Sequence, residues 1–120
     1  MKAVLETHLM TAASEKRVVY YEELAPLVNV NMRDPRQRKA LAVTLGEIST
    51  QTSRTSRRHM LSVIVLSKGE PEATPGQGFY KLARELKRLK PGRDERAFFC
   101  RELKRVFDIC ARERQAAQAG

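Results

Sequence analysis

The stretch that decides the fold runs from Asn31 to Leu66, NMRDPRQRKALAVTLGEISTQTSRTSRRHMLSVIVL. Asp34 is a preferred residue at the N-terminal cap of a helix, and Pro35 follows at the first helical position, where its missing N–H costs nothing. Gln37, three residues after Asp34, completes the pattern of a capping box. We therefore expect a helix over residues 35–54. Three apolar residues at helical spacing form its inner face: Leu41, Leu45 and Ile48.

The opposite face of this helix and its arginine-rich flank are basic and polar. Arginine and lysine neutralise phosphates, valine and threonine can contact the methyl group of thymine, and polar side chains can hydrogen-bond to phosphate. We expect Gly46 to let the backbone approach DNA closely, whereas Glu47 opposes tight contact with a duplex. A solvated basic face without a ligand is the alternative. The candidate nucleic-acid-binding residues are Arg33, Arg36, Lys39, Val43, Thr50, Gln51, Arg54, Arg57 and Arg58.

A strand is expected after this helix, because Met60–Leu66 is apolar at every position but Ser62. A strand that is apolar on both faces needs cover on both sides, so we expect it at the centre of a small sheet. Residues 67–72 read as a turn or loop.

The segments before the long helix complete the order of elements. We expect an amphipathic helix over residues 3–14 and a very short strand over residues 18–20. We expect a short helix over residues 21–25 that ends near Pro26. With the long helix, the strand and the loop, this is the order of a winged helix-turn-helix, in which the second helix enters the major groove and the loop is the wing. We predict an α+β, mainly α fold with a short β-sheet. The residues expected to point inward are Val4, Leu5, Leu9, Ala12, Leu24, Leu27 and Val28.

Two further helices are expected downstream, the second of them long. Residues 79–90 form the first, and Asp94 caps a last helix that ends near Gln115, so that residues 115–120 fray. The last helix has a wider apolar side than a solvent-facing helix needs. Either it packs against two partners within the domain, or part of it is a homodimer face or a docking surface. The candidate interaction residues on that side are Phe98 and Phe107.

Charge is the strongest compositional signal. The 120 residues include 23 basic and 14 acidic side chains, which gives a net charge of +9 and a pI of about 10.1. The basic residues gather in two blocks, residues 31–60 and 81–120. This distribution is typical of proteins that bind a polyanion, so we expect nucleic acid, first of all duplex DNA, as the partner. The alternatives are a basic protein without such a partner, and an adaptor or phage-type inhibitor that meets an acidic protein surface.

The remaining composition limits the class of protein. A chain of this length forms one domain, residues 1–120, and no apolar run approaches the roughly 20 residues that span a membrane. Cys100 and Cys110 lie too far apart along one expected helix for a disulfide, and a reducing cytoplasm is the expected location. His8 and His59 stand in unrelated segments without metal-ligand spacing, so we expect no metal, no cofactor and no catalysis.

The run Val19–Ala25, VYYEELA, followed by a basic helix with Leu45-Gly46, resembles the helix-turn-helix entry of the alkylguanine-DNA alkyltransferase family and its alkyltransferase-like relatives. The resemblance covers about a quarter of the chain and implies a winged helix-turn-helix that binds DNA through the minor groove. The family's Pro-Cys-His-Arg active-site motif is absent, so the resemblance implies no transfer chemistry.

The segment Leu61–Leu66, followed by Pro75–Phe79 (PGQGF), is similar to a small bacterial and phage domain with a YxELA motif, an apolar strand and a PGxGF motif. This similarity extends over most of residues 18–89 and implies no activity. Both resemblances favour a winged-helix-like scaffold, and neither assigns a biological role.

Overall fold

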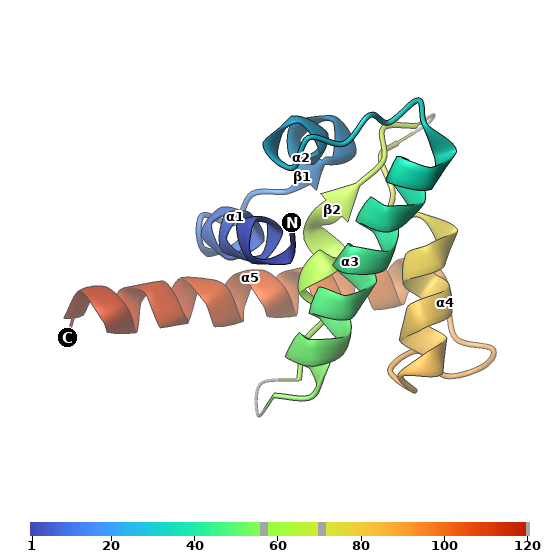
Figure 1. Cartoon of the computed structure of the whole chain (residues 1–120). Helices are drawn as coiled ribbons and strands as arrows, with labels where there is room; N and C mark the ends of the chain where they lie inside the picture. Colours follow the sequence, from blue (N-terminus) through green and yellow to red (C-terminus); the bar gives the residue numbers. More distant parts are fainter. Residues whose placement is uncertain (56–57, 70–71, 120) are drawn as a thin grey trace.

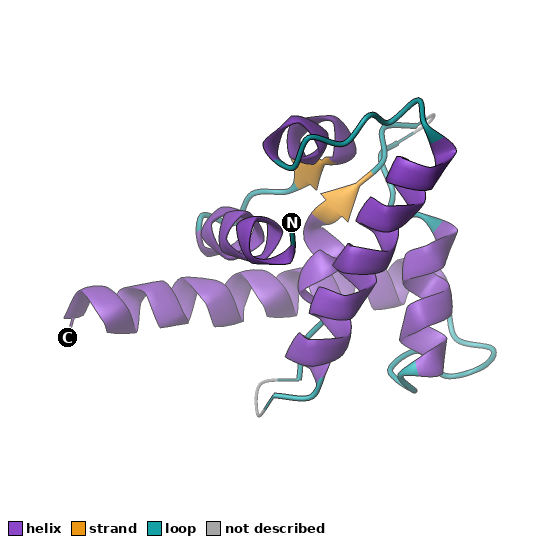
Figure 2. Cartoon of the chain, in the orientation of Figure 1, coloured by secondary structure: helices purple, strands orange, loops and turns teal. Residues whose placement is uncertain are grey.

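The computed structural model describes residues 1–55, 58–69 and 72–119, and it consists mainly of helices with a small parallel sheet (Figure 1, Figure 2). The predicted α+β, mainly α class is confirmed. Within the described residues, no helix is both long enough and apolar enough to cross a membrane. In chain order the elements are α1 (Lys2–Ser14), β1 (Val19–Tyr20), α2 (Tyr21–Leu27), α3 (Pro35–Ser53), the 3₁₀ helix η1 (Leu61–Ile64), β2 (Val65–Leu66), α4 (Gln77–Glu85) and α5 (Glu95–Ala119).

The sheet consists of β1 and β2, which pair in parallel with Val19 opposite Val65. The connection between them contains α2, α3 and η1. Directly after β2, Ser67 and Thr74 form an isolated antiparallel bridge. The 3₁₀ helix η1 contacts α1, α3 and α5. The core therefore lies where these helices surround the segment from η1 to β2.

The inner faces of α1 and α2 differ from the prediction at two positions. Val4 and Leu27, both expected inside, are 49% and 46% exposed, and Ala13 is buried in α1 instead. The helix α2 also continues through Pro26, where we expected it to end. The carbonyl of Glu22, which loses its usual helical donor at Pro26, belongs to an exposed residue and can bind water. The inward positions that are confirmed as buried are Leu5, Leu9, Ala12 and Leu24.

The helix α3 begins where the sequence predicts. Asp34 caps it, because its Oδ1 accepts a hydrogen bond from the backbone N–H of Arg36 at 3.0 Å. Gln37 donates to Oδ2 of Asp34 at 3.1 Å and accepts from the N–H of Asn31 at 2.7 Å, so it supports the cap without the reciprocal bond of a capping box. The three residues of the expected inner face are buried: Leu41, Leu45 and Ile48.

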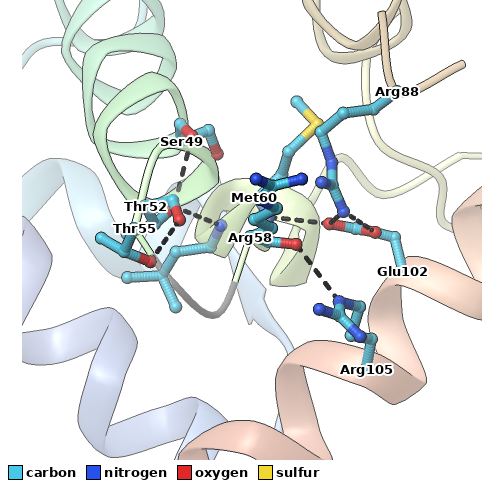
Figure 3. A network of polar contacts seen from close by, with 9 residues as sticks. Ser49, Thr52, Thr55, Arg58, Met60, Arg88, Glu102 and Arg105 are labelled. Atoms are coloured by element: carbon cyan, nitrogen blue, oxygen red, sulfur yellow. Dashed lines mark hydrogen bonds and ion pairs between the residues drawn. The ribbon is translucent and has the colours of Figure 1, made fainter. Parts of the chain in front are cut away.

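The expected strand over residues 60–66 is wrong in its first half, although its burial is confirmed. Residues 61–64 form the turn η1, and the strand β2 follows. Three consecutive backbone N–H groups here donate to side chains of α3 and α5, and Figure 3 shows the bond from Met60 to Glu102. An amide that is satisfied by a side chain needs no neighbouring strand, so the backbone can turn. The bonds are Met60 to Glu102 Oε2 at 2.8 Å, Leu61 to Thr52 Oγ1 at 3.2 Å, and Ser62 to Ser49 Oγ at 2.9 Å.

The last two helices have different bounds from those expected. The helix α4 ends at Glu85 instead of residue 90, because Lys87 turns into the left-handed region and the N–H of Arg88 donates back to the carbonyl of Ala83 at 2.9 Å. The helix α5 continues to Ala119 instead of ending near residue 115. Its last residues are alanine and glutamine, which are good helix formers. Gly120 lies outside the described residues.

The wide apolar side of α5 packs within the chain, against α1 and η1. Phe98, Phe99, Val106 and Cys110 are buried, and Phe107 is half-buried against the same core. Packing against two partners inside the domain, one of the two expected explanations, is therefore confirmed for this side of the helix. Figure 1 shows that the C-terminal part of α5 extends beyond the rest of the chain.

Candidate nucleic-acid interface

A hollow of about 730 Å³ lies at the C-terminal end of α3, where three parts of the chain meet. Figure 1 shows the end of α3 and the connection between α4 and α5 at the bottom of the view, with α5 passing behind α3 and α4. We call this hollow the basic cleft. Its lining residues are Ser53, Arg54, Arg58, Leu86, Lys87, Arg88, Phe98, Arg101, Glu102 and Arg105.

Six basic side chains and one carboxylate line the basic cleft. The carboxylate, Glu102, is paired with Arg88. Elsewhere on the surface, basic residues of α4 and α5 pair with acidic neighbours, as Arg84 does with Glu95 and Lys104 with Asp108. Four cations of the cleft have no ion-pair partner among the described residues: Arg54, Arg58, Lys87 and Arg101. Their charges create a concentrated positive potential at this end of the molecule.

Two of these cations stand in a backbone conformation that side chains disfavour. Arg58 has φ of 48° and Lys87 has φ of 61°. Both values lie in the left-handed region, which glycine adopts without the steric cost that a Cβ brings. The carbonyl of Arg58 accepts a hydrogen bond from Nε of Arg105 at 3.2 Å, which connects this backbone to α5. The cleft therefore keeps charged side chains at positions where glycine would be less strained.

Glu102 connects α5 to the turn after α4 and to the segment before η1 (Figure 3). It is 4% exposed, and its two carboxylate oxygens accept from Nη2 of Arg88 at 2.6 and 2.7 Å. One of the same oxygens accepts from the backbone N–H of Met60. A buried carboxylate that holds both a guanidinium and a backbone amide fixes the turn after α4 and the start of η1 against α5.

His59 is buried behind the same end of α3. Its side chain is 7% exposed, and its Nδ1 finds no hydrogen-bond partner among the described residues. Burial lowers the pKa of His59 below its ordinary value of 6.5, although the carboxylates of Glu113 and Glu102 act in the opposite direction. The ring is therefore neutral at neutral pH, and protonating it disfavours the folded arrangement.

The positive surface continues along α5 on both sides of the cleft. One neighbouring hollow of about 490 Å³ lies toward the start of α5, and another of about 310 Å³ lies along its middle. Arg101 lines both hollows as well as the basic cleft. We call this surface the α5 track. Its basic residues are Arg88, Lys90, Arg93, Arg101, Lys104, Arg105 and Arg112.

The basic residues predicted from the sequence separate into two groups, one at each end of α3. The positions of Arg36 and Arg54 are 18 residues apart, about 27 Å along the helix. Arg54 and Arg58 line the basic cleft. Arg57 lies outside the described residues. The group at the other end is exposed and consists of Arg33, Arg36 and Lys39.

The middle of α3 shows a mixed outcome. Val43 is 50% exposed and Gln51 is exposed, whereas Thr50 is half-buried and its hydroxyl donates to the carbonyl of Gly46 at 2.8 Å. The expected role of Gly46 is wrong, because a Cβ there would lie 3.6 Å from the side chain of Leu82. Gly46 therefore faces α4, where a Cβ would make ordinary van der Waals contact with Leu82.

The expectation that Phe98 forms an exposed interaction surface is also wrong. Phe98 is 5% exposed, and its ring packs against that of Phe79 with centroids 6.1 Å apart. Phe107 is half-buried against the core. An aromatic side chain that is already packed within the chain leaves little area for a second partner.

The sequence prediction missed the cleft residues of the turn after α4 and of α5. These residues belong to the second basic block, so the charge count contained a signal, but the prediction placed binding on α3 and its arginine-rich flank. Only the fold brings the turn after α4 and the middle of α5 to the end of α3. The missed residues are Lys87, Arg88, Arg101 and Arg105.

The described residues contain no group of three or more His, Cys, Asp or Glu side chains that could hold a metal ion. No family model matches the chain, and no curated protein or solved structure matches it either.

Proposed function

We propose that the chain is a cytoplasmic, non-catalytic protein that binds nucleic acid, first of all duplex DNA, through phosphate contacts in the basic cleft and along the α5 track. The single observation that carries the proposal is the convergence of six basic side chains from three parts of the chain on one hollow with one carboxylate. The binding free energy of a polyanion is most favourable where cations lie close together and are not neutralised by carboxylates of the protein itself.

The length of the α5 track favours a nucleic acid over a small anion as the ligand. Within α5, the track extends from the first helical residue, Glu95, to Arg112, which are 17 positions apart, about 26 Å for the helical rise. A duplex presents one negative charge per roughly 1.7 Å of its axis, so it can occupy cations along such a path simultaneously. A single small anion would occupy one hollow and leave the others empty.

The order of elements supports a winged helix-turn-helix scaffold as part of the proposal. A helix, a short strand, a pair of helices, the turn η1 and a second strand follow one another, and in this proposal the Ser67–Thr74 bridge corresponds to the base of the wing. In such a scaffold α3 is the helix that faces DNA. Its exposed side ends at the basic cleft, so both surfaces can meet one duplex.

An acidic protein surface is the second candidate partner, because it offers the same charge. A salt titration with two polyanions separates the two. We expect the chain to bind a short mixed-sequence duplex with an affinity that falls steeply with salt, with a logarithmic slope of about −3 to −4 if the four unpaired cations each contact a phosphate. Polyglutamate of equal charge serves as the control and should bind more weakly.

Fluorescence anisotropy with a labelled duplex gives both affinities. Equal or tighter binding of polyglutamate would indicate that the partner is an acidic protein surface and not DNA. Absence of duplex binding even at low salt would contradict nucleic-acid binding altogether.

A further inference from the structure

The shape of the basic cleft suits one end of a strand better than a continuous backbone. Its volume of about 730 Å³ falls within the range of roughly 300–1,000 Å³ that is typical of sites for single small molecules. Three parts of the chain wall it: the end of α3 with Arg58, the turn that contains Lys87 and Arg88, and the middle of α5. A duplex presents a broad convex surface that lies across the mouth of such a hollow, whereas the terminal nucleotide of a strand can enter it.

The charge of the cleft favours the same ligand. A terminal phosphomonoester carries a charge of about −1.5 to −2 at neutral pH and three strong acceptor oxygens, whereas each phosphodiester within the strand carries a single negative charge. Arg54, Arg58 and Arg101 offer guanidinium groups that can bind phosphate oxygens in pairs, and none has an ion-pair partner among the described residues. A hollow with several unpaired cations therefore distinguishes the more highly charged end group from the backbone.

The backbone of the cleft holds two of its cations in defined positions. Arg58 and Lys87 have left-handed φ values, as do Lys16 and Asn29 outside the cleft. The hydrogen bond from Arg105 holds the carbonyl of Arg58, and the turn that ends α4 holds Lys87. The two charged side chains therefore extend from a fixed backbone.

The α5 track gives the rest of the strand a path away from the cleft. Arg101 lines the cleft and both neighbouring hollows, so a strand whose end lies in the cleft can continue past it along α5. Resting on the proposed function, we propose that the basic cleft binds the terminal phosphomonoester of a DNA strand, and that the chain therefore binds phosphorylated DNA ends in preference to continuous duplex.

The test uses one duplex in three forms: with 5′-phosphates, with 5′-hydroxyls, and closed at both ends by hairpin loops. Binding is measured by anisotropy competition at one salt concentration. We expect the phosphorylated form to bind about tenfold more tightly than the other two, because the terminal phosphate adds one set of charge-assisted hydrogen bonds to the cleft. The Arg101→Ala variant should lose this preference and retain weaker binding of all three forms. Lys81→Ala, an exposed charge change on α4 outside the cleft and the track, should retain the preference.

Equal affinity of the wild-type chain for the three forms would overturn the end-binding inference and leave the proposed function standing. Failure to bind any form would overturn the proposed function itself. A nucleoside 5′-monophosphate that competes as strongly as the phosphorylated duplex would show that the cleft takes a free nucleotide, and it would likewise overturn the inference. Loss of the preference in Arg101→Ala with retention in Lys81→Ala would support it.

Discussion

The two ends of α3 carry the same kind of residue in different surroundings. At the N-terminal end, Arg33, Arg36 and Lys39 are exposed on one helix and the turn before it. At the C-terminal end, Arg54 and Arg58 share a cleft with basic side chains of two later segments. The sequence around α3 carries a similar number of basic residues at each end of the helix. The two ends differ in their surroundings because distant segments of the chain converge only at the C-terminal end. A basic helix therefore does not by itself identify where a polyanion binds.

The physical consequence of this difference is the strength of the local potential. Charges spread over an exposed surface are screened by salt beyond about 8 Å at physiological ionic strength. Charges that line a hollow face one another across a smaller volume of water, so their potentials add where the ligand lies. We expect the C-terminal end of α3 to dominate polyanion binding, and the following predictions are designed to break or sharpen that contrast.

The largest effect is expected from Glu102→Ala, which removes the carboxylate that connects α5 to the turn after α4 and to the segment before η1. The variant leaves Arg88 without its carboxylate and the N–H of Met60 without its acceptor. We expect the free energy of unfolding to fall by about 3 kcal/mol, as for other broken buried ion pairs. Urea unfolding followed by circular dichroism measures the change.

Asp108→Ala is the control for this prediction. It removes a carboxylate from the same helix that pairs with Lys104 at the surface. Because surface ion pairs contribute little, we expect almost no change in unfolding. Similar losses for the two variants would contradict the structural role assigned to Glu102.

Acidification should loosen the cleft end of α3 through His59. Its folded pKa lies below 6.5, so below that pH the unfolded chain binds more protons than the folded chain, and stability falls as the pH decreases. Stability from this source is fully present above the ordinary histidine pKa and is lost at lower pH. We expect the Tm to decrease by a few degrees between about pH 7.5 and about pH 5.5.

The variant His59→Gln should reduce this dependence in a thermal scan at the two pH values. Hydrogen exchange compares the two ends of α3. The amides at its C-terminal end should lose protection in acid before those near Asp34. A pH dependence in this window that is unchanged in His59→Gln would contradict the assignment.

The smallest effect on stability, with an opposite sign, is expected from Lys87→Gly. Glycine adopts the φ of 61° without the cost of a Cβ, so the free energy of unfolding should rise by up to about 1 kcal/mol. DNA binding should weaken at the same time, because a cleft cation is lost. Chemical unfolding and duplex titration measure the two effects in one variant.

Lys16→Gly is the matched control, because Lys16 has φ of 56° and lies outside the cleft. It should show the gain in stability without the loss of binding. If Lys87→Gly binds DNA as the wild type does, Lys87 has no part in the interface.

Much of α3 was predictable because its signals are local. The cap at Asp34, the proline at the first helical position and the spacing of Leu41, Leu45 and Ile48 act within a few residues of one another. Periodicity similarly identified Leu5, Leu9 and Ala12 of α1 and the wide apolar side of α5, although Val4 is exposed. Such features depend on the backbone geometry of a single helix, which the sequence specifies directly.

The turn at η1 and the basic cleft depend on contacts between distant residues. A buried apolar run such as residues 61–66 fits a strand or a turn equally well, and the acceptors that favour the turn, Ser49, Thr52 and Glu102, come from α3 and α5. Likewise, Arg54 and Arg101 are 47 positions apart, and their shared cleft follows from the packing of whole helices. Charge counts located the two basic blocks, but no local pattern showed that they meet.

The most direct test compares two double variants that remove equal charge, one from the basic cleft and one from the N-terminal end of α3. Arg54→Ala/Arg101→Ala removes cations of the basic cleft, and Arg36→Ala/Lys39→Ala removes cations of the N-terminal end. The affinity of each for the same duplex is measured at the same salt concentration. We expect the cleft variant to bind about tenfold more weakly than the wild type and the other variant to lose about twofold. Equal losses, or a larger loss at the Arg36 end, would contradict the claim that the cleft is the nucleic-acid interface.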